Sequence, residues 1–167
     1  RHGQHVQYIY VQLARSRGFI SRSPSSGTLR PICRSAAGIA MLTQESQEKV
    51  ALLSRTRAAV EGRPIDLHEL MDRIEAARRS GYAWQAESNV PGMGDVAVLL
   101  HEMDPFGKAL TLSVGAGAAV VRKEHEKLGR YLRELADTFS ARLPRTSPQQ
   151  LLGQDVARDF GADVVAG

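Results

Sequence analysis

The residues best suited to bind a ligand lie where the segment Pro31–Leu42 turns from extended chain into a helix. Pro31 disfavours helical backbone before it, and Ser35 is a good N-cap residue. Small residues follow at positions 36, 37, 38 and 40, so no bulky side chain covers the free N–H groups of the helix start. Those donors, at the positive end of the helix dipole, suit a small anion or a carbonyl oxygen. The same small residues would also let the helix lie close against a sheet.

Residue types used in catalysis and metal binding are present but form no recognised set. None of the five histidines has the spacing of a metal site, and there is no second cysteine. The chain has no GxSxG, P-loop or GxGxxG motif. Cys33 could act as a nucleophile, but packing beside the helix start is the simpler interpretation. We therefore predict no enzyme activity, no catalytic residue, no metal site and no cofactor.

The composition is that of a globular protein of 167 residues, with 43% hydrophobic and 24% charged residues. The net charge is +4, but the basic residues are spread among acidic ones, which argues against a DNA-binding surface in this segment. No apolar run reaches the length of a membrane span, and the single cysteine fits a reducing compartment. We expect a cytoplasmic protein without membrane contact. Because the chain starts at Arg1, we also expect a further segment upstream.

Hydrophobic periodicity divides the chain into strands, helices and a tail. Strands are predicted at 5–12, 19–22, 29–32, 82–87, 96–103 and 108–115, and helices at 35–42, from Thr43 to about 60, at 66–79 and at 121–143. The turn signal at 104–107 joins the last two strands as a hairpin. This order predicts an α+β (α/β) fold in one domain over residues 1–143, an antiparallel sheet of about five or six strands flanked by helices. No role is assigned to the tail at 144–167.

Three parts of the chain are expected to meet over one end of this sheet. They are the helix start at 35–38, the loop-to-strand junction at 93–96, and the end of the hairpin at 113–115. Together they offer backbone N–H donors, one hydroxyl and one carboxylate in an apolar setting. This is the composition of a small-molecule pocket.

Three blocks of sequence add a resemblance. Gly27 precedes Pro31-Ile-Cys-Arg-Ser35-Ala-Ala-Gly38-Ile-Ala40-Met-Leu42; Arg78-Arg-Ser-Gly81-Tyr82-Ala83 precedes Glu87 and Gly92; and a strand ends in Leu112-Ser113-Val114-Gly115. In the order and spacing of these blocks, from about Gly3 to Leu143, the chain resembles the effector-binding domain of the IclR family of bacterial transcriptional regulators.

The resemblance implies a GAF-like, profilin-like domain that binds a small effector, such as an organic acid or an aromatic or hydroxylated metabolite. It also implies a homodimer or homotetramer, and contact with DNA only through an N-terminal winged helix-turn-helix that this chain lacks. Carried over by position, the effector would meet the backbone amides of Ala36 and Ala37 and the backbone of Gly115. It would also meet four side chains, those of Gln85, Met93, Asp95 and Ser113.

Several of these positions depart from the common family pattern. A cysteine is usual where Asp95 stands, an acid where Gln85 stands, often a serine where Gly115 stands, and frequently a histidine where Cys33 stands. In an apolar pocket Asp95 would repel a carboxylate ligand, and the pKa of Asp95 should rise so that its protonated form could donate a hydrogen bond. Alternatively it selects hydroxyl or amino groups, or it binds a loop amide and touches no ligand.

Two other classes of function remain open. A GAF-like module that only dimerises would have its pocket filled by Met93 and Trp84 and would bind no ligand. A small enzyme using Cys33 or Asp95 would show a reactive thiol or turnover, and nothing in the residue inventory favours it.

Overall fold

The computed structural model describes residues 3–12, 25–87, 90–103 and 109–142, of which 101–103 and 140–142 are described by their backbone alone. The elements in chain order are β1 (His5–Gln7), β2 (Leu29–Pro31), the 3₁₀ turn η2 (Ile32–Arg34), α1 (Ala36–Leu42), α2 (Gln47–Glu61), α3 (Leu67–Ser80), β3 (Ala83–Gln85), β4 (Met93–Met103), β5 (Ala109–Gly117) and α4 (Ala118–Arg142). This order confirms the predicted α+β class, with antiparallel strand pairs flanked by helices.

The described strands form two sheets, so the predicted single sheet of five or six strands is not confirmed. Within the described residues, β3, β4 and β5 form a three-stranded sheet in that order, and β1 pairs with β2 separately. The strand expected at 5–12 ends at Gln7, because Tyr8 bonds to the turn before β2 and the chain beyond it is exposed, with Ile9 74% exposed. The strand expected at 19–22 and the turn expected at 104–107 lie outside the described residues.

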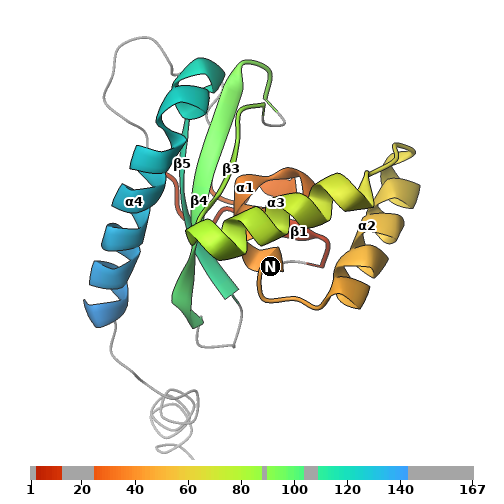
Figure 1. Ribbon diagram of the computed structural model, residues 1–167, viewed down its shortest axis with the longest axis horizontal. Coiled ribbons are helices and arrows are strands. Elements are labelled where there is room, and N and C mark those ends of the chain that lie inside the picture. The colour runs from red at the N-terminus through yellow and green to blue at the C-terminus, as the bar shows by residue number, and fades with distance from the viewer. Residues whose placement is uncertain (1–2, 13–24, 88–89, 104–108, 143–167) are drawn as a thin grey trace, which may run out of the picture.

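Helices cover both faces of the three-stranded sheet (Figure 1). Alternate residues of β4 point to opposite faces. Val96, Val98 and Leu100 pack in one apolar cluster with α4. Ala97 and Leu99 pack in the other cluster, which holds α1 and the buried face of α3. The sheet is therefore the middle layer, with α4 on one side and α1 and α3 on the other.

Local sequence signals account for the helix ends at three positions, and the predicted cap at Ser35 is confirmed. Ser35 and Asp66 cap the starts of α1 and α3 by accepting backbone N–H bonds, and Gly81 ends α3 in the left-handed conformation with φ of 78°. Thr43 was expected to cap the second helix but instead closes α1, its hydroxyl donating to the carbonyl of Ala40. The second helix starts after Ser46, which is its N-cap.

Two element boundaries near the expected pocket also differ from the prediction. β4 starts at Met93 rather than at 96, and α4 starts at Ala118 rather than at 121. Both shifts have one cause, because the Ala118 N–H donates to the carbonyl of Gly92 at 2.9 Å. This bond extends the pairing of β4 with β5 to Met93 and Gly117, where α4 begins.

Small residues let α1 and α4 approach their neighbours closely. All seven residues of α1 are buried. A Cβ at Gly38 would lie 1.9 Å from the carbonyl oxygen of Ile32, and one at Gly129 would lie 2.5 Å from Cγ of Tyr82. The interpretation of the small residues at 36–40 as packing positions is thus confirmed.

The apolar surface of α4 divides into two parts. Leu132 and Ala136 are buried against the sheet, whereas Tyr131, Leu135 and Phe139 are 62%, 40% and 51% exposed. These three exposed residues, at intervals of four, form one line along α4, which we call the α4 stripe. The sheet therefore covers only one half of the helix's apolar surface.

Candidate functional site

The site residues predicted in the sheet share one face of it. Gln85 is the register partner of Asp95, and Asp95 is the partner of Gly115. The neighbouring rows on the same face pair Met93 with Gly117 and Ala97 with Ser113. Ala97 packs in the cluster that contains α1. The face that carries these residues is therefore the one that α1 covers.

The start of α1 lies directly against this face. The backbone N–H of Ala36 donates to Oδ2 of Asp95 at 3.0 Å, across 59 positions of sequence. Ser35 Oγ accepts from the Gly38 N–H and donates to the carbonyl of Pro31, both at 3.1 Å. Ala36 and Ala37 are buried, with exposed fractions of 0% and 2%. The structure thus brings the helix start and the carboxylate of Asp95 together. The carboxylate itself accepts from the Ala36 N–H, which was one of the donors predicted to bind a ligand.

Asp95 is a buried carboxyl group in a polar surrounding. Its exposed fraction is 9%, and burial raises its pKa above the ordinary value. The Gln85 side chain, the Ala36 N–H and the charges of Arg73 and Arg30 oppose this rise. Oδ1 of Asp95 is buried and accepts no hydrogen bond from the described residues. Asp95 therefore has one satisfied and one unsatisfied oxygen.

Gln85 is held by two hydrogen bonds that join three elements. Its amide nitrogen donates to the carbonyl of Arg34 at 3.1 Å, and its carbonyl accepts from Arg73 Nη2 at 2.9 Å. Arg34 in turn donates through Nε to Glu61 at 2.8 Å. Arg73 of α3, Gln85 of β3 and the backbone of the η2 turn thus form one network beside Asp95, and the Gln85 side chain helps to lower the pKa of Asp95.

Three residues near Asp95 were not among the predicted site residues. Arg73 in α3 and Arg30 in β2 are close enough to lower the pKa of Asp95, and the charge of Asp95 contributes to a raised pKa of Tyr8, after the larger effect of burial. A possible signal for Arg73 was its position beside the buried residues Leu70 and Ile74 of α3, where a charged side chain needs a partner. No local pattern marks Arg30 or Tyr8.

The amino-acid sequence matches a known family over most of its length. A family model described as the bacterial transcriptional regulator IclR, C-terminal, matches residues 1–141. The chain belongs to the IclR C-terminal family. No curated protein sequence shows significant similarity to it.

Solved structures show that this IclR-family domain has the fold of others in the family. The effector domain of a transcriptional regulator IclR from Acinetobacter sp. ADP1 is 18% identical, with a TM-score of 0.69 over 86% of this chain and 83% of that chain. The transcriptional regulator YaiJ is 24% identical, with a TM-score of 0.71 over 88% and 83%. The repressor BlcR of Agobacterium tumefaciens is 19% identical, with a TM-score of 0.64 over 84% of this chain and 56% of its own.

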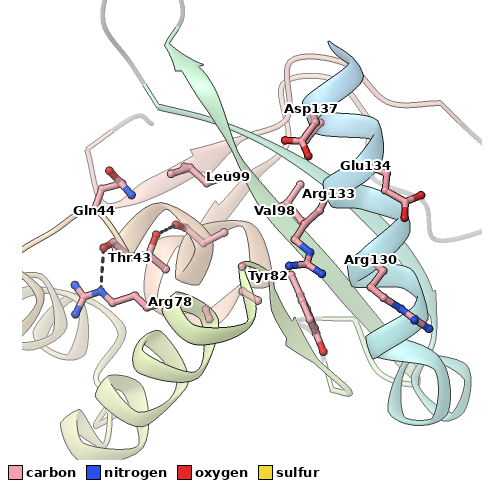
Figure 2. A pocket seen from close by; sticks show the side chains of 15 residues that line it. Thr43, Gln44, Arg78, Tyr82, Val98, Leu99, Arg130, Arg133, Glu134 and Asp137 are labelled. Atoms are coloured by element: carbon pink, nitrogen blue, oxygen red, sulfur yellow. Dashed lines mark hydrogen bonds between the residues drawn. The ribbon is translucent and has the colours of Figure 1, made fainter. Parts of the chain in front are cut away.

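Two pockets of this IclR-family domain lie mostly outside the predicted site. One, of about 580 Å³, lies between the ends of α1 and α3 and the middle of α4, and contains none of the predicted residues (Figure 2). Arg133 reaches from α4 to the end of α3, and a Cβ at Gly81 would lie 3.0 Å from its Cδ. This pocket also contains Arg130, Glu134 and Asp137, so its charges favour no single class of ligand.

A second pocket, of about 670 Å³, lies along α3 and β3. Gln85 is the only predicted site residue in its wall, where it stands with its partner Arg73. Because Gln85 pairs with Asp95 across β3 and β4, the carboxyl group of Asp95 lies one strand behind the wall of this pocket.

The remaining candidate residues of the sequence make structural contacts. Cys33 is 2% exposed and packs in the cluster that contains α1. Trp84 stacks on His125 of α4 at 4.0 Å, on the sheet face opposite Asp95, so it does not fill the predicted pocket. Among the residues that the structure describes, no cluster of three or more potential ligands suits a metal ion. No described helix is long and apolar enough to cross a membrane.

Proposed function

We propose that this chain is the effector-sensing and oligomerisation domain of an IclR-type transcriptional regulator, in which a small organic molecule modulates operator binding. The supporting observation is the arrangement of Gln85, Met93, Asp95, Ser113 and Gly115 on one sheet face beneath the start of α1. Asp95 is buried, Gly115 is exposed and the other three are half-buried; a few polar groups that converge beside apolar ones are typical of small-molecule sites.

In this proposal the ligand lies between α1 and the sheet. The amide of Ala37 and the hydroxyl of Ser113 would bind its polar groups, and Met93 would contact its apolar part. Binding would shift an equilibrium between subunit arrangements, by no more than the difference in the ligand's affinity for the two arrangements.

DNA contact belongs to a part of the protein outside this chain. The chain spans only 56% of the BlcR chain that it matches. We place a winged helix-turn-helix upstream, the effector-binding domain at 1–143, and the regulator in the cytoplasm with the DNA. No role is proposed for 144–167.

Self-association would use the α4 stripe. Tyr131, Leu135 and Phe139 expose a line of large apolar side chains on one helix, and a second copy of the chain would remove that surface from water. We therefore propose that the protein forms a homodimer or homotetramer.

The test is made on the full-length regulator with its own operator DNA. We expect one class of small molecule to raise the melting temperature and to change operator affinity together. Both effects should be lost in Ser113→Ala and kept in Thr138→Ala, whose hydroxyl bonds only within α4, to the carbonyl of Glu134. A ligand effect that survives Ser113→Ala unchanged would place sensing elsewhere.

A ligand-free dimerisation scaffold is the second candidate. It is favoured by the hydrogen bond from Ala36 to Asp95, which occupies a donor that a ligand would need. It predicts that no small molecule raises the melting temperature, while the α4 stripe still holds two copies together.

A further inference from the structure

The unsatisfied oxygen of Asp95 needs a partner. Oδ1 is buried with no donor among the described residues, although Oδ2 of the same group is bonded to Ala36. Leaving a buried acceptor unsatisfied costs about 1–3 kcal/mol, and more when it carries charge. Native proteins rarely retain such an atom unless a water or a ligand completes it. The position of Oδ1 therefore indicates a missing donor.

The neighbouring side chains do not supply this donor. The Gln85 side chain lowers the pKa of Asp95, while its amide nitrogen donates to the carbonyl of Arg34 and its carbonyl accepts from Arg73. Arg73 and Arg30 act on Asp95 through their charges. None of these side chains is hydrogen-bonded to Oδ1, and Gln85 and Arg73 stand in the wall of the pocket along α3 and β3.

The other oxygen of Asp95, Oδ2, prevents an anion from binding at the start of α1. A ligand carboxylate would have to accept a hydrogen bond from the Ala36 N–H, and Oδ2 of Asp95 already does so at 3.0 Å. Two carboxylates at one amide would repel each other in a poorly solvated site. The protein's own side chain thus takes the place of an acidic ligand.

We propose that Asp95 is a built-in carboxylate at the head of α1, and that the effector presents an N–H or O–H donor to Oδ1 of Asp95. The ligand class is then an amide, amine or polyhydroxylated compound rather than a simple organic acid. This inference rests on the proposed sensing function and names the ligand chemistry of the same site.

The experiment compares acetate with acetamide, which have nearly the same shape but opposite hydrogen-bonding character. Binding to the ¹⁵N-labelled chain is followed by NMR through the amide resonances of Ala36 and its neighbours. Wild-type protein should bind acetamide more tightly than acetate. In Asp95→Ala the preference should reverse, with acetate affinity about tenfold higher than in wild type, since the freed N–H and the vacated space accept its carboxylate.

Two further variants keep the test decisive. Val96→Ala removes a buried side chain from the opposite face of the same strand and should keep the wild-type preference. Asp95→Asn retains an acceptor for Ala36 but turns the unsatisfied oxygen into an N–H donor, so it should favour acetate even if Asp95→Ala does not fold.

Three results would overturn the inference. They are wild-type protein that binds acetate as tightly as acetamide, wild-type protein that binds neither probe near Ala36, and an Asp95→Asn variant that still prefers acetamide. Failure of the proposed function looks different: no small molecule changes operator binding, yet the preference between the two probes still reverses in the Asp95 variants.

Discussion

At the scale of single residues, Asp95 has one carboxylate oxygen that makes a structural hydrogen bond and one that has no hydrogen-bond partner among the described residues. Its Oδ2 caps the start of a helix far away in sequence, as an acid near a helix N-terminus should. Its burial and its unsatisfied Oδ1 work in the other direction, because they penalise the ionised form. The net direction is a raised pKa, so the stability of the fold should depend on the protonation of this one group.

Asp95→Asn should change the pH dependence of stability. The pKa of Asp95 is higher in the folded chain than in the unfolded one, so its stabilising effect is complete below the unfolded pKa. That effect is lost as pH rises through the folded pKa. The variant lacks this loss, and its stability relative to wild type should improve as pH rises above about 4, the ordinary pKa of an aspartate. Urea denaturation across this range measures the difference, and parallel curves for the two proteins would contradict the expectation.

Gly38 is the residue where the backbone leaves no space for any side chain. Gly38→Ala would place a Cβ 1.9 Å from the Ile32 carbonyl oxygen, so α1 must move away from the η2 turn. We expect a loss of about 3 kcal/mol, at the upper end of overpacking effects. Ala40→Gly in the same helix should cost only about 1 kcal/mol. Urea denaturation compares the two, and equal losses would show that contact with η2 does not restrict position 38.

At the scale of elements, α1 and α3 supply the groups that surround Asp95. α1 supplies the amide of Ala36, and α3 supplies Arg73, which fixes Gln85. α3 is placed by sequence signals of ordinary kind, a cap at Asp66 and a left-handed glycine at its end. The position of Arg73 therefore depends on how firmly α3 is capped.

Asp66→Ala should loosen the first turn of α3. The Asp66 carboxylate accepts from the N–H groups of His68 and Glu69 at 2.8 and 3.1 Å. Losing both bonds should cost about 1 kcal/mol of stability. Asp66→Asn keeps an accepting oxygen and should cost only a few tenths of that. Thermal unfolding with hydrogen exchange of the α3 amides measures the effect, and no difference between the two variants would show that the cap is unimportant.

At the scale of the whole molecule, the three-layer arrangement leaves one helix incompletely covered. The sheet buries one half of the apolar surface of α4, and the α4 stripe stays in solvent. Large exposed apolar lines of this kind commonly mark a contact between subunits. The same helix also borders the pocket of Figure 2, so a partner on α4 would lie close to it.

Leu135→Ser should weaken self-association and leave the fold intact. Leu135 is 40% exposed, so its replacement should change the stability of the monomer by less than about 0.5 kcal/mol. Leu132→Ala, one turn away and 4% exposed, should instead cost about 2–3 kcal/mol of stability. Sedimentation velocity measures association, and unchanged association in Leu135→Ser would remove the α4 stripe from the proposed interface.

The sequence alone determined the local features of this protein. The caps at Ser35 and Asp66, the glycine at 81 and the alternation along β4 depend on nearby residues, so they could be predicted. The family resemblance implied that Gln85, Asp95 and Ser113 would meet one effector, whereas the strand register placed them on one sheet face. Tertiary structure decided the partners of these side chains. No local pattern could show that Asp95 binds the amide of Ala36, 59 positions away, or that half of the α4 apolar surface stays exposed. Hydrogen bonds and burial depend on which elements meet in space, and only the packed layers determine that.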